Sequence, residues 1–351
     1  MRKGVCNNNK PRESNFELLR IIAMFMILIL HADFKTFGFP TNEDLMQSPT
    51  LAYVRVFYEM ACVVAVNVFV LISGWFGITP SLKGFAKFAF QCLFFSIAIY
   101  VASVLCGQTT FSTKGVVECF AIKADDYWFI PAYICLYIFA PVLNVFLRTA
   151  GKHIIASILL AFFIFQCLYS FVGNGAMFLM NGYSTLSFMG LYMLSYWIKN
   201  YVDVSKYSKS LFLLGYLILT ILLTVTYLYL IDINLNATAR RIVVYSNPIV
   251  ILSSVLLLLY FSRIHIKSAL INNIAVSCFS VYLFHSNPNL IYRYTESVGG
   301  INMGSKILDS IVVLGVISIW FVIPILMDKL RILIYNMLMA FKRSLCKASY
   351  D

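Results

Sequence analysis

The sequence predicts an all-α, polytopic membrane protein with about ten membrane-spanning helices and no soluble domain. The 351 residues are 61% hydrophobic and only 12% charged, and the mean hydropathy is +0.83. Ordinary soluble domains carry about 25% charged residues, so this composition excludes that class. Apolar runs close to the ~20 residues needed to cross a bilayer also follow one another along the whole chain.

Each expected span is an apolar run bounded by polar or basic residues. The ten runs are 16–32, 54–77, 85–106, 127–148, 154–173, 182–198, 211–231, 242–261, 270–291 and 307–327. The sixth is short and has the weakest pattern of the ten. The segment 330–347 mixes apolar with basic residues, which is typical of a helix lying on anionic lipid. We therefore expect a cytoplasmic tail (1–15), a membrane domain (16–328) and a cytoplasmic amphipathic helix with its tail (329–351).

The basic residues predict the orientation. If the N-terminus is cytoplasmic, 18 of the 27 Lys and Arg residues fall in inside segments and seven fall in outside loops. Short cytoplasmic loops carry an excess of Lys and Arg in membrane proteins. Both chain ends are therefore expected in the cytoplasm.

Several function classes find no support in the sequence. It contains no phosphate-binding loop, dinucleotide fingerprint, zinc-protease motif or nucleic-acid motif. The nine Cys are scattered without a Cys-x-x-Cys pair, so neither disulfides nor a metal site is expected. The net charge of +12 is explained by membrane topology and needs no nucleic-acid partner.

Arg20 and His31 lie inside the first apolar run. Eleven residues at about 100° each make roughly three turns plus 20°, so both side chains share one helix face about 16 Å apart. Ionisable groups inside a membrane are costly and usually functional. This face therefore presents a fixed cation near the cytoplasm and a proton-transfer group near the outer surface.

Four segments, in order, resemble a known family. The first helix carries Arg20, ten residues, and then His31; residues 66–75 read Val-Asn-Val-Phe-Val-Leu-Ile-Ser-Gly-Trp. Residues 127–141 begin Tyr-Trp-Phe-Ile-Pro, and residues 280–288 read Ser-Val-Tyr-Leu-Phe-His-Ser-Asn-Pro. Over about 15–327 the chain resembles the membrane acyltransferase-3 family. It departs by having Lys83 and Lys87 where many members have an Arg-rich pair, and by lacking the esterase-like domain that some members append.

The resemblance implies an O-acyltransferase, most simply an O-acetyltransferase, in a bacterial plasma membrane. The co-substrate would be cytoplasmic acetyl-CoA or another acyl-CoA, with no metal. The acceptor would be a hydroxyl of an envelope or exported glycan or a lipid-linked saccharide. Membrane lipid is the other expected partner, nucleic acid is not expected, and the oligomeric state stays open.

Residue roles follow from this chemistry. His31 suits the general base for a hydroxyl, because a histidine pKa lies near neutral pH. Arg20 with Lys83 and Lys87 would hold the phosphates of CoA, although Arg20 could instead reach up to lipid phosphates. Ser73 is expected to be structural or to contact CoA.

The remaining candidates each have a simpler alternative. Glu59 would orient His31 as the second catalytic residue, or would merely pair with Arg55 four residues away. Asp126, Tyr127 and Trp128 would form a sugar platform, or only an acidic loop with an interfacial aromatic belt. His285 is expected at the depth of His31, in a substrate-binding or a structural role, and Asp33 is expected to be solvated.

Two other functions compete with acyl transfer. A transporter or flippase for a lipid-linked glycan should place polar groups near the centres of several spans. A glycan polymerase should have a large polar outer loop, whereas the longest loops here have only about 20 residues. The nearly charge-free centres of the spans favour the acyltransferase.

Overall fold

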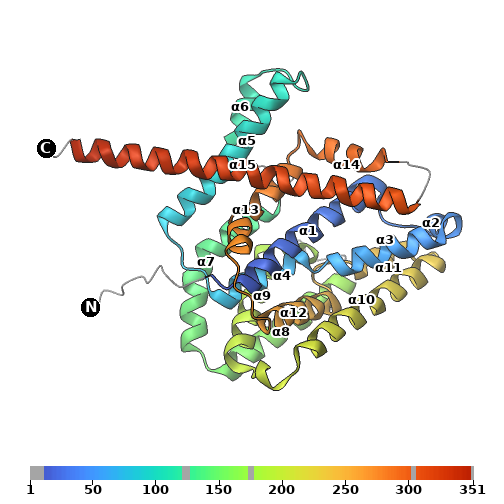
Figure 1. The fold of residues 1–351 in the computed structure, drawn as a ribbon. Coiled ribbons are helices and arrows are strands. Elements are labelled where there is room, and N and C mark those ends of the chain that lie inside the picture. Colours follow the sequence, from blue (N-terminus) through green and yellow to red (C-terminus); the bar gives the residue numbers. More distant parts are fainter. Residues whose placement is uncertain (1–11, 121–126, 173–177, 302–305, 349–351) are drawn as a thin grey trace.

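The computed structural model describes residues 12–120, 127–172, 178–301 and 306–348, and within them it contains helices and no strand. The longer helices form one bundle, with α1 in its middle (Figure 1). The helices, in chain order, are α1 (Ser14–Phe37), α2 (Asn42–Gln47), α3 (Pro49–Cys62), α4 (Ala65–Phe76), α5 (Leu82–Leu105), α6 (Thr113–Phe120), α7 (Phe129–Thr149), α8 (Lys152–Val172), η1 (Met180–Gly182), α9 (Thr185–Tyr201), η2 (Val204–Lys206), α10 (Lys209–Asp232), α11 (Asn236–Ile242), α12 (Pro248–Ser262), α13 (Ala269–His285), α14 (Ile291–Gly299) and α15 (Lys306–Ala348).

The all-helical prediction is confirmed for the described residues, and each expected span overlaps a helix. Seven helical stretches there are long and apolar enough to cross a membrane. The other three expected spans are shorter: α12 has 15 residues, and α9 and α13 have 17 each. At 1.5 Å per residue, 15 residues cover about 23 Å, less than the ~30 Å hydrocarbon core. The structure thus shows a multi-pass protein, while the expected number of ten crossings is not confirmed.

Local signals explain why α12 and α13 are short. Pro248 occupies the first turn of α12, and the side chain of Asn247 caps it by accepting from the N–H of Ile249. Ser268 caps α13 in the same way through the N–H of Ile271. The α12 cap begins that helix six residues later than the apolar run at 242. Helix α13 begins at Ala269, close to the expected start, and is short because it ends at His285, three residues before Pro288.

The C-terminal helix differs from the expectation. Residues 330–347 do not form a separate interfacial helix, because α15 continues without a break for 43 residues. No Gly or Pro lies between Met327 and Leu330 to stop it, and Pro324 is accommodated inside the helix. In Figure 1, α15 crosses the top of the bundle and its C-terminal half extends beyond it.

Hydrogen bonds gather the helix ends on two opposite sides. At one side, Asn15 bonds to the carbonyl of Phe261, and Ser14 bonds to that of Ser268. At the other side, the Asn42 side chain reaches the carbonyl of Ile231. These contacts join the start of α1 to the α12–α13 turn, and the end of α1 to the end of α10. They agree with the alternation of loops expected from the sequence.

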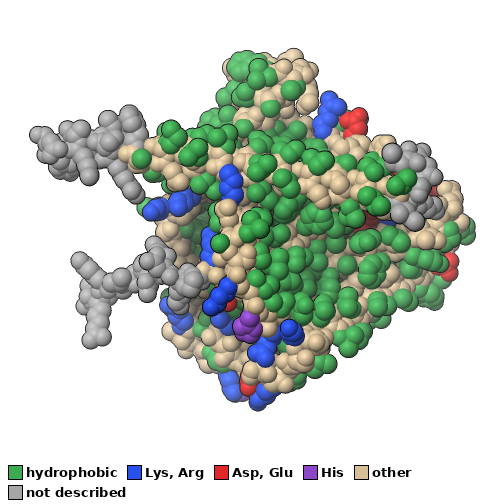
Figure 2. Space-filling model, in the orientation of Figure 1, with side chains coloured by type: hydrophobic (Ala, Val, Ile, Leu, Met, Phe, Trp, Pro, Cys, Tyr) green, Lys and Arg blue, Asp and Glu red, His purple; other side chains and the backbone are tan. Residues whose placement is uncertain are grey.

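The surface matches a protein embedded in lipid. Figure 2 shows hydrophobic side chains spread over the centre of one face, along α15 and the helices beneath it. Lys and Arg side chains gather at the left and lower edges of the same face, on the side where α1 begins. This distribution is the one that a membrane-embedded bundle with basic loops on one side requires.

Candidate active site

His31 on α1 contacts a second histidine, His285, at the last residue of α13. Nδ1 of His31 lies 2.9 Å from Nε2 of His285. His285 is fully buried, whereas His31 is half-buried. The sequence placed both histidines at one depth, and the structure brings their rings together.

The remaining contacts of His285 determine which nitrogens carry protons. Its Nδ1 lies 2.5 Å from the carbonyl oxygen of Val281, which can only accept, so this nitrogen donates. In the neutral ring, Nε2 of His285 must then accept, and it accepts from Nδ1–H of His31. Nε2 of His31 is left with its lone pair and has no hydrogen-bond partner among the described residues. The pair therefore holds His31 in the tautomer that a general base needs.

A cavity of about 350 Å³ lies along α1 and includes His31 in its wall. We call it the α1 cavity. It extends along this helix from Met24 to Lys35, which spans about 16 Å at 1.5 Å per residue. Its inner end is thus one helical turn from Arg20. Its length matches the separation of Arg20 and His31 expected from the sequence.

Three aromatic rings form the wall opposite α1. The ring centroids of Trp128 and Tyr183 lie 4.5 Å apart, as do those of Tyr183 and Tyr245. All three residues line the α1 cavity. Sugars pack on such rings through their apolar faces. The Trp128 prediction therefore gains two partners, Tyr183 and Tyr245, that the sequence did not reveal.

Asn67 and Gly182 hold this aromatic wall in place. The buried Asn67 side chain donates to the carbonyl of Tyr245 at 3.0 Å. Gly182 has φ +98°, and a Cβ there would lie 2.6 Å from Cβ of Tyr245 and 2.8 Å from N of Ser246. Only glycine fits this backbone conformation at this close approach.

Glu59 does not make the contact that the sequence suggested. Nδ1 of His31 is occupied by His285, and both carboxylate oxygens of the buried Glu59 lack a hydrogen-bond partner among the described residues. Glu59 lies beside Asp33 instead. The pairing of Arg55 with Glu59 is also not seen, since Arg55 Nε donates to Asp33 Oδ1 at 2.6 Å. Asp33 is thus a half-buried ion-pair partner, and its expected solvation is wrong.

Arg20 is paired at its end of α1. Its guanidinium lies 2.7 Å from Oε1 of Glu17, and Arg12 approaches the same oxygen at 3.5 Å. Lys329 on α15 belongs to the same neighbourhood. The thiol of Cys278 lies near Glu17, Arg20 and Lys329. Arg20 and Arg12 thus share one carboxylate, and the Lys329 ammonium donates to the side chain of Asn273, so two guanidinium groups against Glu17 leave this end a positive charge suited to phosphates. Arg12 and Lys329 are the candidates that the sequence analysis missed, because they come from different segments.

The other expected CoA contacts lie on α4 and α5. Lys83 and Lys87 are exposed at the start of α5, and Lys87 lies over the ring of Tyr335 at 5.9 Å. Ser73 Oγ lies 3.1 Å from the hydroxyl of Tyr133 and so links α4 to α7.

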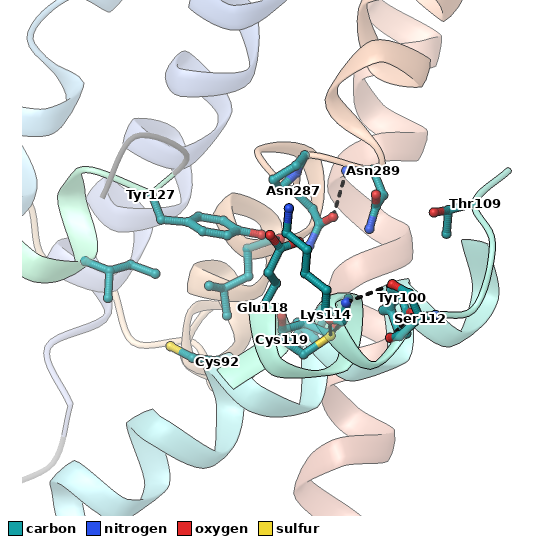
Figure 3. A pocket seen from close by; sticks show the side chains of 16 residues that line it. Cys92, Tyr100, Thr109, Ser112, Lys114, Glu118, Cys119, Tyr127, Asn287 and Asn289 are labelled. Atoms are coloured by element: carbon teal, nitrogen blue, oxygen red, sulfur yellow. Dashed lines mark hydrogen bonds between the residues drawn. The ribbon is translucent and has the colours of Figure 1, made fainter. Parts of the chain in front are cut away.

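Tyr127 lies in a different cavity from Trp128. Its hydroxyl donates to the carbonyl of Leu283 at 3.0 Å, and its ring forms one side of a second cavity of about 270 Å³. Figure 3 shows Tyr127 across this cavity from Tyr100 and Ser112. Burial raises the pKa of the Cys119 thiol in its wall, so the thiol stays protonated at neutral pH. Asp126, the third member of the expected platform, lies outside the described residues.

A comparison with known protein families identifies the family of this chain. The family model described as an acyltransferase domain matches residues 13–327, which include α1, both histidines and the aromatic wall. No curated protein and no solved structure matches the chain. The matched segment covers most of the 351 residues, and the chain therefore belongs to the acyltransferase-3 family of membrane acyltransferases.

Proposed function

We propose that this protein transfers an acyl group, most simply acetyl, from cytoplasmic acyl-CoA to a hydroxyl of an envelope or exported glycan. The observation that carries the proposal is the His31–His285 pair in the wall of a cavity that ends one turn from Arg20. In this proposal the protein is an O-acyltransferase of the bacterial plasma membrane.

The residues fit the two substrates at opposite ends of the α1 cavity. Arg20, Arg12 and Lys329 supply cations for the phosphates of CoA at the inner end. The apolar wall between Met24 and His31 suits the uncharged arm that carries the thioester. Trp128, Tyr183 and Tyr245 suit a saccharide at the outer end.

The chemistry requires one proton carrier. Nε2 of His31 takes the proton of the acceptor hydroxyl as its oxygen bonds to the thioester carbonyl carbon. The carbon–sulfur bond then breaks, and His31 returns the proton to the departing sulfur. His285 holds the ring through Nδ1 and stabilises the imidazolium that forms in between. No net proton is released, so the site needs no further base.

The test is transfer of labelled acetyl from acetyl-CoA to envelope glycan in membranes. General-base catalysis contributes typically 10²–10⁴-fold, so His31→Gln should nearly abolish transfer at normal expression. His265→Gln is the matched control, because His265 is exposed and outside the α1 cavity. Near-normal transfer by His31→Gln would refute the base role. A transporter or flippase, the alternative function, would move glycan without consuming acetyl-CoA.

A further inference from the structure

The outer mouth of the α1 cavity is basic. Lys35 lies four residues beyond His31, and side chains four apart share a helix face. Arg240 on α11 is the second cation in the wall of this cavity. Among the residues that the structure describes, no Asp or Glu lines it. The mouth is therefore lined by two cations, one of them a helical turn from His31.

Arg240 is held in place without being neutralised. Its guanidinium lies 5.6 Å from the centroid of the Phe39 ring, which also lines the cavity. Within the described part of the chain it makes no ion pair or side-chain hydrogen bond. Arg55 provides the contrast, because Asp33 lies 2.6 Å from it and Asp44 lies 4.0 Å from it. The charge of Arg55 is already balanced, whereas that of Arg240 is directed to the cavity mouth.

We propose that the acceptor carries an anionic group, a carboxylate or a phosphate, that binds between Lys35 and Arg240. The proposal rests on the acyl-transfer function proposed above and adds the chemical class of the acceptor. One helical turn separates Lys35 from His31, or about 6 Å along the axis. This distance is comparable to one monosaccharide unit. The anionic group therefore belongs to the acylated sugar or to its immediate neighbour.

The arrangement also determines which part of the acceptor is recognised. The planar guanidinium of Arg240 can donate two parallel hydrogen bonds to a carboxylate or phosphate, while Lys35 adds a point charge. Trp128, Tyr183 and Tyr245 line the same cavity and offer their rings to the sugar. The cations orient the acceptor so that its hydroxyl faces Nε2 of His31. A membrane lipid phosphate is the competing source of the same anion.

The experiment uses the full chain in a non-ionic detergent, with three probes. Methyl glucoside is neutral, methyl glucuronide carries a carboxylate, and glucose 6-phosphate carries a phosphate. Binding is followed by the shift in Tm, which does not depend on catalysis, and acetyl transfer to each probe is measured separately. The variants are Arg240→Gln, Arg240→Lys and Lys35→Gln. Arg293→Gln is the control, because Arg293 is exposed on α14, pairs with Glu296 and lies outside the cavity.

We expect the two anionic probes to bind more tightly than methyl glucoside. Arg240→Gln should weaken their binding roughly 10- to 100-fold, as loss of a charge-assisted hydrogen bond does, and should leave methyl glucoside unaffected. Arg240→Lys should restore part of the affinity, and Arg293→Gln should behave like wild type. Phosphatidylglycerol added to the micelles should not replace the effect of the sugar anions.

Three binding results would overturn the inference. These are equal binding of neutral and anionic probes by wild type, unchanged binding by Arg240→Gln, and an Arg240-dependent Tm shift with phosphatidylglycerol alone. A different result would refute the proposed function. Anion binding that depends on Arg240, without acetyl transfer to any acceptor, would support the anion site and refute the transfer reaction. Equal acetyl transfer to glucoside and glucuronide would refute only the anion site.

Discussion

His31 and His285 are 254 residues apart in the chain, yet Nδ1 of one lies 2.9 Å from Nε2 of the other. The contact joins α1 to α13 inside the bundle. It gives the two histidines different surroundings, where the sequence predicted only that they lie at the same depth. His31 lines the cavity, whereas His285 is buried and contacts His31, so in the proposed reaction His285 is a positioning residue.

This assignment predicts a split between kcat and KM. His285→Ala should lower kcat about 10- to 100-fold, because His31 loses the partner that sets its tautomer, and should leave both KM values near wild type. His285→Gln should recover part of kcat, since its amide oxygen can accept from Nδ1–H of His31. Steady-state kinetics of purified variants with matched Tm values provide the measurement. An unchanged kcat in His285→Ala would remove the positioning role.

Glu59→Gln should retain most of the wild-type kcat. The reason is that His31 already has a partner at Nδ1, while the oxygens of Glu59 have none among the described residues. Comparison with His31→Gln in the same labelled-acetyl assay measures the difference. If the two variants lost activity equally, the catalytic role expected from the sequence for Glu59 would be restored.

Arg20→Ala should raise the apparent KM for acyl-CoA without loss of insertion into the membrane. Arg20→Lys should be only partly tolerated, because an ammonium replaces a planar fork that both Glu17 and phosphates can use. Lys206→Ala is the control: this exposed lysine pairs with Asp203 at 3.7 Å and does not line the α1 cavity. Equal acyl-CoA binding by wild type and Arg20→Ala would refute the phosphate role.

Gly182→Ala should damage acceptor use while sparing the donor. An alanine there must adopt φ near +98° and push against Tyr245 and Ser246, at a cost of about 1–3 kcal/mol. We expect a lower Tm and a higher acceptor KM, with an unchanged KM for acyl-CoA. Gly151→Ala is the matched control, because nothing lies within 4 Å of its added Cβ. The same defect in both variants would contradict a specific role for the aromatic wall.

Reporter fusions test the orientation. Fusions at Lys83 and Lys206 should report the cytoplasm, and fusions at Lys114 and Arg293 should report the outside, because the basic loops stay inside. At each site, the activity of a reporter that works only in the periplasm is compared with that of a reporter that works only in the cytoplasm. The reverse pattern would place His31 near the cytoplasm and refute an outer acceptor site.

The sequence by itself determined the helical membrane class, the positions of the apolar helices and the shared face of Arg20 and His31. These features depend on composition, helical periodicity and local caps, which act within a few residues. It could not determine that α15 continues past Leu330, because its mixed basic and apolar pattern is compatible with either a new helix or a continuous one.

Only the tertiary structure decided which side chains meet. It paired His31 with His285 and not Glu59, joined Asp33 to Arg55, separated Tyr127 from Trp128, and brought Lys35 and Arg240 to one cavity mouth. Each of these contacts depends on which helix faces pack together. That choice minimises the free energy of the whole bundle, so no local pattern in the chain records it.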